Sequence, residues 1–197
     1  MSRVAPREPA SIALTGRRSI ADLVWVANTR HGPGGHWFAR VTHDEGDHDH
    51  LTTSDDAVRY LADHHVELPP ELPTVEDLAA LTEIREMVRK LAEPAAAWTT
   101  GALRILSRAS FRLDREGSLQ SVDLGWAGFI EDLMVPLLEV VRQRDRLSLC
   151  GNPHCRLIFL DASKSGTRRW CDDAGCGNRD RVKRHRRRQI PSAAASS

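Results

Sequence analysis

Four cysteines are the residues of this chain best suited to chemistry, and all lie within 27 residues near the C-terminal end. They form two pairs of equal spacing, Cys150-x4-Cys155 and Cys171-x4-Cys176, with fifteen residues between the pairs. Two such pairs can close on one ion, and zinc prefers four soft thiolates in tetrahedral geometry. Four unconnected thiols would not explain the pairing. The spacing therefore predicts a zinc site held by all four cysteines, which is structural because no coordination position stays open.

The chain around the cysteines predicts a small finger. Between the pairs, RLIFLD is typical of a strand, SKSG of a turn, and TRRW leads back to Cys171, so we expect residues 156–170 to form a β-hairpin. After the second pair, GNRDRVKRHRRR contains no helix breaker from Asn178 to Gln189, so we expect a helix that begins near Cys176. A zinc knuckle, a hairpin and a helix in this order predict a treble-clef-like zinc finger.

Charge is distributed unevenly along the chain. Residues 1–149 carry 17 Lys and Arg against 23 Asp and Glu, a net charge of −6, whereas residues 150–197 carry 11 against 4, a net charge of +7. Seven of the cations lie between Arg179 and Arg188, which predicts a surface for a polyanion. Cations around most of a helix suit phosphate contact better than base recognition. The predicted nucleic-acid-binding residues are Arg168, Arg169, Arg179, Arg181, Lys183, Arg184, Arg186, Arg187 and Arg188.

Other interpretations of the basic run stay open. It could be a solvated helix face, or it could serve an acidic surface on a protein partner, which would make the finger an adaptor. Arg179 could have a structural role, pairing with Asp161 or with loop carbonyls beside the metal. Trp170 and Phe159 are the only possible stacking platforms in the module, fewer than single-strand binders usually have.

The N-terminal part predicts a mainly helical domain with a small β-hairpin. Apolar residues at helical spacing follow N-cap candidates at Ser19, Ser54 and Thr74, the last with Asp77 as a capping acid. Two further helices are expected over residues 96–109 and 126–145, the second bent by Pro136. A strand is expected over 37–41, and SFRLD-REGS-LQSVDL, residues 110–124, predicts the β-hairpin.

These elements predict an α+β chain of two domains. We expect a helical domain over 1–147, the finger over 148–190 and a disordered tail over 191–197. The N-terminal stretch has no apolar core of signal-peptide length, and no run approaches the roughly 20 apolar residues of a membrane span. We therefore expect a cytoplasmic protein with no membrane segment.

Several stretches resemble a known bacterial family. Residues 149–188, above all FLDASKSGTRRWC followed by CGNR, closely resemble the CGNR-type zinc finger. Upstream, ADLVWVANTR, LTTSDDAVRYLADHH and VEDLAALTEIREMVRKL look like the ABATE domain that accompanies this finger. The resemblance implies a stress-induced transcriptional regulator whose finger binds zinc and DNA. It implies no catalytic residues for the upstream domain.

Histidines and tryptophans offer two further candidate sites. The segment HDEGDHDH, with His43, His48 and His50, could ligate a metal or support hydrolysis, but nothing in the sequence fixes it on a rigid element, so we interpret it as a mobile polar loop. Four tryptophans could line an effector pocket, although core packing is the commoner role; these are Trp25, Trp37, Trp98 and Trp126.

The sequence as a whole predicts a zinc-dependent, DNA-binding transcriptional regulator that is not an enzyme. No GxSxG, P-loop, HExxH or dinucleotide motif is present. The N-terminal domain would act as a sensor or an interaction domain. A zinc-stabilised adaptor for protein or RNA is the alternative, and the sequence leaves open a small-molecule effector and a homodimer.

Overall fold

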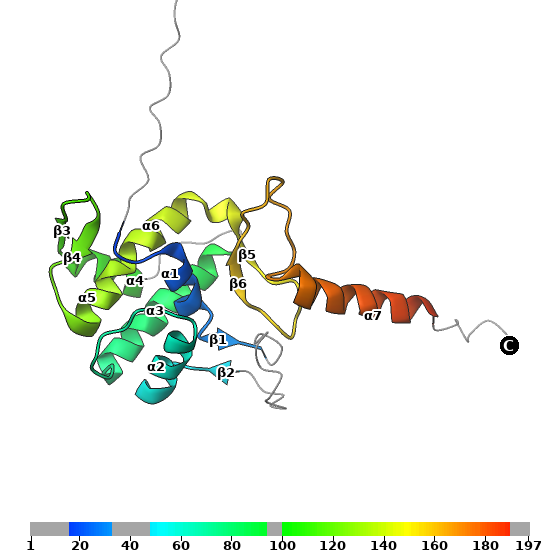
Figure 1. The fold of residues 1–197 in the computed structure, drawn as a ribbon, viewed down its shortest axis with the longest axis horizontal. Coiled ribbons are helices and arrows are strands. Elements are labelled where there is room, and N and C mark those ends of the chain that lie inside the picture. The colour runs from blue at the N-terminus through cyan, green and yellow to red at the C-terminus, as the bar shows by residue number, and fades with distance from the viewer. Residues whose placement is uncertain (1–15, 33–47, 94–99, 190–197) are drawn as a thin grey trace, which may run out of the picture.

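The structure is a computed structural model that describes residues 16–32, 48–93 and 100–189. Helices dominate, with three two-stranded hairpins, and one helix projects from the body at the C-terminal end (Figure 1). The fold is therefore α+β, as expected. The elements are α1 Ile20–Ala27, β1 Arg30–His31, β2 His48–Asp49, α2 Ser54–Asp63, α3 Val75–Leu91, α4 Thr100–Arg108, β3 Phe111–Leu113, β4 Leu119–Ser121, α5 Gly125–Asp132, α6 Met134–Arg142, η1 Arg144–Arg146, β5 Leu147–Leu149, β6 Ile158–Leu160, η2 Asp173–Gly177 and α7 Asn178–Gln189.

Capping side chains fix where the first helices begin. Ser19 caps α1, and Thr74 caps α3 together with Asp77, both as predicted. Each forms a reciprocal capping box, and the acid that completes the box at α1, Asp22, was not predicted. Helix α2 begins at Ser54, but its cap is Thr53, whose hydroxyl accepts the backbone N–H of Asp56, so the predicted cap was one residue late.

The core lies where α1, α3, α5 and α6 pack together. Each helix contributes an apolar face at 3-and-4 spacing, which removes its side chains from water at about 1.5–3 kcal/mol for each large aliphatic residue. Trp126 is also buried and donates its indole N–H to the Glu71 carbonyl at 2.8 Å, so it is a core residue as expected. The fully buried residues of these helices include Leu23, Val26, Leu81, Ile84, Val88, Leu133, Leu137 and Val140.

The predicted bent helix over 126–145 is two helices, α5 and α6, which meet at Leu133. The break precedes Pro136 by three residues because the proline ring has no N–H to donate and would crowd the carbonyl of Asp132, four residues earlier. Pro136 then sits in the first turn of α6, where a missing donor costs little.

Two hairpins were anticipated, and only one of them forms. Strands β3 and β4 pair as predicted, with Arg112 opposite Gln120 and Gly117 at a positive φ in the turn. The second predicted hairpin, over residues 156–170, is wrong. Strand β6 pairs instead with β5, which precedes the first cysteine, and residues 161–170 contain no strand.

Several predicted segments fall on residues that the structure does not describe. They are the strand over 37–41, the first residues of the 96–109 helix and the tail over 191–197. Among the described helices, none combines the length and the apolar character needed to cross a membrane.

Candidate metal centre and basic helix

The four cysteines come together from two separate segments of the finger. Their Sγ atoms all lie within 4.8 Å of one another. Cys155 Sγ lies 3.6 Å from Cys171 Sγ, which is 3.9 Å from Cys176 Sγ. Two sulfurs each about 2.3 Å from one tetrahedral zinc ion lie about 3.8 Å apart. Because the cysteines are free thiols rather than disulfides, the cluster suits a metal ion.

The thiols of the cluster shift one another's pKa values. Hydrogen bonds with Cys155 and Cys171 lower the pKa of the Cys150 thiol. The bonds with Cys150 and Cys171, together with burial, raise the pKa of Cys155. One thiolate is thus stabilised by protons that its neighbours keep. Four thiolates need a cation among them, and a divalent metal ion would replace the shared protons.

The first cysteine pair is positioned by the β5–β6 hairpin, for which it forms the connecting knuckle. Cys150 donates its backbone N–H to the Leu157 carbonyl at 2.8 Å, and Cys155 donates to Asn152 at 2.9 Å. The Asn152 amide also approaches Cys176 Sγ at 3.5 Å, linking the knuckle to the second pair. Asn152 was not predicted as a site residue.

The loop to the second cysteine pair is held by a buried carboxylate. Asp161 accepts the backbone N–H groups of Ser163 and Arg168, each at 2.8 Å. These hydrogen bonds lower the pKa of Asp161 below the usual aspartate range. The Asp161 carboxylate therefore stabilises its own loop. The sequence had suggested a structural role for it only as a partner of Arg179.

A single π-helical turn, η2, carries Cys176 into helix α7. Asp172 caps this turn through the backbone N–H of Gly175. A Cβ on Gly177 would lie 2.4 Å from Asp173 Oδ1 and 3.2 Å from the Trp170 ring, so a larger residue would have to displace the exposed Asp173 carboxylate. The ligand turn and the helix therefore form one continuous unit, close to the helix start predicted from the sequence.

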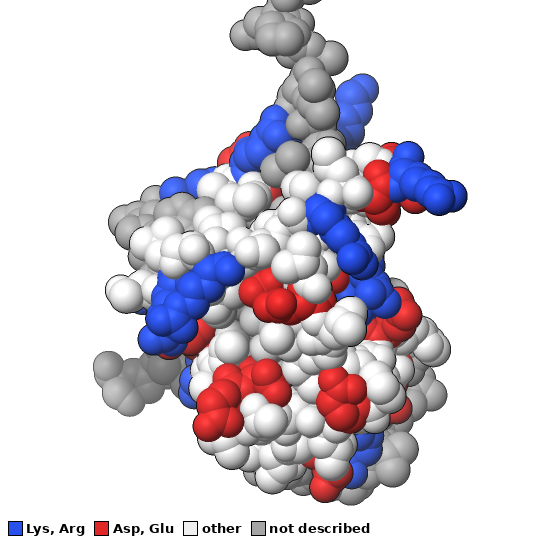
Figure 2. Space-filling view, turned by 90° about the vertical axis from the view of Figure 1, so that its left-hand side faces the viewer, with Lys and Arg blue, Asp and Glu red and all other residues white. Residues whose placement is uncertain are grey.

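Helix α7 exposes its cations on a projecting rod (Figure 1). None of its residues is buried. Arg181 pairs with Asp173 at 3.0 Å and Arg184 with Asp180 at 2.8 Å. No ion pair of the described residues involves Lys183, Arg186, Arg187 or Arg188. At the opposite end of the molecule, acidic side chains are scattered among uncharged and basic ones (Figure 2).

The other two predicted nucleic-acid-binding arginines lie in the loop before Cys171. Arg168 donates to the carbonyls of Trp170 and Cys171, and its guanidinium lies 5.2 Å from the centre of the Phe159 ring. Arg169 lies at the same distance over Trp170. Both side chains are exposed, but Arg168 already stabilises the loop, and a nucleic-acid contact by either stays a prediction.

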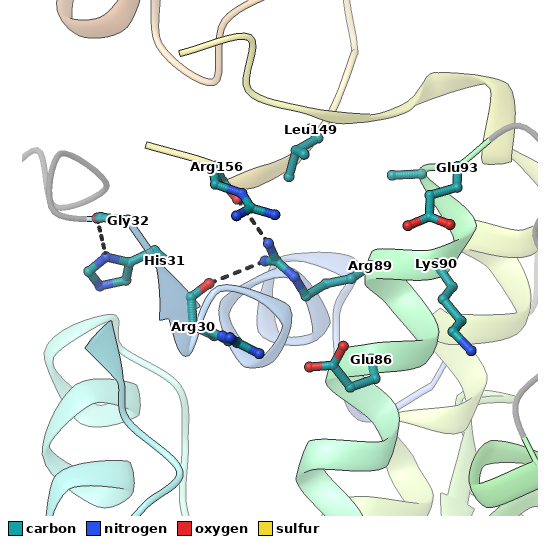
Figure 3. Close-up of a pocket in the computed structure, with 10 residues that line it drawn as sticks. Arg30, His31, Gly32, Glu86, Arg89, Lys90, Glu93, Leu149 and Arg156 are labelled. Atoms are coloured by element: carbon teal, nitrogen blue, oxygen red, sulfur yellow. Dashed lines mark hydrogen bonds between the residues drawn. The ribbon is translucent and has the colours of Figure 1, made fainter. Parts of the chain in front are cut away.

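Contacts between the finger and the helical domain were missed by the sequence reasoning. The buried Asn28 side chain binds the backbone of Ile158, and Arg89 donates to the carbonyls of Arg30 and Arg156. Arg30, Arg89 and Arg156 line a cavity of about 280 Å³ between the two parts (Figure 3). An asparagine at the end of a helix carries no sequence signal of a partner 130 residues away.

The histidine-rich segment is only partly described. His43 lies outside the described residues. His48 belongs to β2, and His50 follows it with its backbone N–H bound to Thr29 at 2.8 Å. The expected mobile loop is therefore wrong for these two histidines, because pairing with β1 holds them in place.

Comparisons with known proteins divide the chain in the expected order. Residues 22–139 match the ABATE family, described as "Putative stress-induced transcription regulator", and residues 146–189 match the CGNR zinc finger. A search of curated proteins found no match. Both families are regulatory or zinc-finger types rather than enzyme families. Since the first match spans more than half of the chain, the protein belongs to the ABATE family and carries a CGNR zinc finger after the ABATE domain.

Proposed function

We propose that this protein is a zinc-dependent, DNA-binding transcriptional regulator in which the finger presents α7 to the phosphate backbone of duplex DNA. The observation that carries the proposal is α7 itself. It is a twelve-residue helix with no buried residue, and it is attached to the body through the turn that carries Cys176. Seven cations on such a helix repel one another, and a polyanion would relieve that repulsion.

Zinc would be held by Cys150, Cys155, Cys171 and Cys176. The ion would supply the folding free energy that so small a module lacks, since the apolar residues around the cysteines are few. It would thereby fix the direction of α7. We do not propose that α7 recognises individual bases.

One side of α7 suits the phosphates best. At 100° per residue, Arg179, Lys183 and Arg186 lie within about 60° of one another. The two ion pairs of the helix engage Arg181 and Arg184, which lie round from that side. We therefore assign the main phosphate contact to the side of Lys183 and Arg186.

The helical domain would act as the sensor or interaction domain. Strands β5 and β6 place Leu147 and Ile158 in the core of that domain, and Asn28 fastens β6 to α1. A change at the end of α1 would therefore reach the finger directly. We propose that the helical domain spans residues 1–147 and the finger residues 148–190. We also propose that the protein binds DNA as a homodimer.

The test compares two charge reversals that are equal in net charge. The full chain, loaded with zinc, is titrated onto duplex DNA at several salt concentrations by fluorescence anisotropy. We expect Lys183→Glu/Arg186→Glu to weaken binding and to flatten the log–log salt slope by about 1.8, at about 0.9 for each phosphate that is no longer neutralised. Arg184→Glu/Arg188→Glu, on the other side, should weaken binding less.

Two outcomes would contradict the proposal. Equal losses in the two double variants would mean that net charge alone attracts DNA, with no preferred side. Zinc-loaded wild-type protein with no affinity for DNA at physiological salt would overturn DNA binding and favour the protein adaptor.

A further inference from the structure

Three histidines gather in the helical domain, away from the cysteines. His31 lies in β1 opposite His48 in β2, and His50 follows β2. The ring centre of His31 lies 5.3 Å from those of His48 and His50, which are 6.0 Å apart. His31 is almost fully buried, at 2% exposure, and the other two are half-buried. This cluster has no part in the proposed DNA binding.

Two ring nitrogens in the cluster face each other. Nε2 of His31 lies 3.3 Å from Nε2 of His50. On the far side of each ring, Nδ1 of His31 lies 2.9 Å from the carbonyl of Gly32, and Nδ1 of His50 lies 3.0 Å from a carboxylate oxygen of Asp56. Figure 3 shows the His31 ring turned in this way.

The outer contacts fix the tautomers. A carbonyl and a carboxylate can only accept hydrogen bonds, so both Nδ1 atoms carry protons. When both rings are neutral, the lone pairs of their Nε2 atoms point at each other. A metal ion bound to both nitrogens, or a proton shared between them, would satisfy that arrangement.

We propose that His31 and His50 bind a divalent metal ion of the zinc class through their Nε2 atoms, with His48 as the third ligand. Nitrogens about 2.0–2.1 Å from one tetrahedral zinc ion lie about 3.4 Å apart, close to the 3.3 Å between the two Nε2 atoms. Imidazoles on one such ion have ring centres about 5 Å apart, close to the spacing of this cluster.

The surroundings provide the hydrogen-bond acceptors that histidine metal ligands require on their outer nitrogens. A carboxylate or carbonyl on Nδ1 fixes the ring and raises its basicity, and here Asp56 and Gly32 supply one each. Tyr60 stacks on the His50 ring with centres 4.3 Å apart. Both ligand rings are thus held before any ion arrives.

Strand β2 is also held from its other side. Asp49, between His48 and His50, forms a two-point ion pair with the buried Arg85, at 2.6 and 3.1 Å. His48 needs one adjustment, because the cysteines are the only described group of three or more whose ligand atoms all lie within 4.8 Å of one another. We expect its ring to turn toward the pair when the ion binds.

The test measures metal binding apart from DNA. Full-length protein whose finger is already loaded is titrated with zinc by calorimetry, and we expect one further equivalent per chain. His31→Gln and His50→Gln should abolish that equivalent, and His48→Ala should weaken it. Asp56→Asn, which keeps both ligands, should weaken it about 10–100-fold. His64→Gln is the matched control, because the Nδ1 of His64 is committed to the Tyr60 carbonyl at 2.7 Å.

Circular dichroism of each variant shows whether it has folded. If His31→Gln fails to fold because His31 is buried, Asp56→Asn still tests the proposal. A wild-type protein that takes up no second equivalent would overturn the site and leave the two imidazoles sharing a proton. Unchanged affinity in folded His50→Gln would overturn it as well, and unchanged affinity in His48→Ala would overturn the role of the third ligand.

Discussion

The side chain of Asn28, at the end of α1, binds both backbone polar groups of Ile158 in β6. Its amide donates to the Ile158 carbonyl at 3.0 Å, and its oxygen accepts the Ile158 N–H at 2.7 Å. The Asn28 carbonyl in turn accepts the Tyr60 hydroxyl at 2.9 Å. One buried residue thus connects two helices of the ABATE domain to the strand that follows the first metal knuckle.

Replacing Asn28 should loosen the finger from the helical domain. Asn28→Ala leaves the N–H and the carbonyl of Ile158 buried without partners, at about 1–3 kcal/mol for each group. We expect a lower midpoint in urea unfolding and faster hydrogen exchange at the Ile158 amide. Val75→Ala, at an exposed position 78% open to solvent, is the control and should change neither. An Asn28→Ala protein with the wild-type unfolding curve would show that this contact does not join the two parts.

Removing one cysteine should unfold only part of the finger. In Cys176→Ser the metal site loses a thiolate, so we expect loss of zinc and of the helical signal of α7, while residues 1–145 stay folded. Strands β5 and β6 should stay protected, because Leu147 and Ile158 are buried in the helical core. Hydrogen exchange with mass spectrometry resolves these regions. His154→Ala changes an exposed residue of the first knuckle and should keep the metal. Retention of zinc in Cys176→Ser would remove Cys176 from the ligand set.

The loop between the cysteine pairs should depend on the Asp161 carboxylate. Because hydrogen bonds lower its pKa, its contribution is complete above the ordinary aspartate range and is lost as pH falls through the lowered value. From about pH 6 to pH 8, Asp161→Asn should therefore raise hydrogen exchange at the Arg168 amide by a factor that does not vary with pH. A factor that changes across this window would mean that another group controls the loop.

A side chain at position 177 should disturb the start of α7. In Gly177→Ala the new Cβ lies 3.2 Å from Trp170 and too close to the Asp173 carboxylate, which must turn away and give up its ion pair with Arg181. We expect a weaker affinity for zinc, measured by competition with a chelator. Asn178→Ala, at the exposed first residue of α7, should have wild-type affinity. A Gly177→Ala protein equal to wild type would show that the turn adapts without strain.

Local signals in the sequence predicted much of this molecule. The N-caps Ser19 and Thr74, the β3–β4 hairpin and the pairing of the cysteines each depend on residues close together in the chain. The partner of β6 could not be found in this way. RLIFLD is a strand with either partner, and burial of Leu147 and Ile158 against the helical domain selects β5.

Long-range polar contacts were invisible for the same reason. Asn28 and Ile158 are 130 residues apart, and the residues between His31 and His50 gave no sign that the two histidines would meet. The run of cations in α7 was evident in the sequence. Only the structure shows which side of the helix faces away from Asp173 and Asp180.

The most direct test of the central claim measures metal content and duplex-DNA binding on one purified sample, in a salt titration with and without a chelator. The proposal predicts zinc in the cysteine site and DNA binding that weakens steeply as salt rises and is lost when the chelator removes that zinc. DNA binding of equal strength in the metal-free protein would contradict it, because the basic helix would then act without the finger.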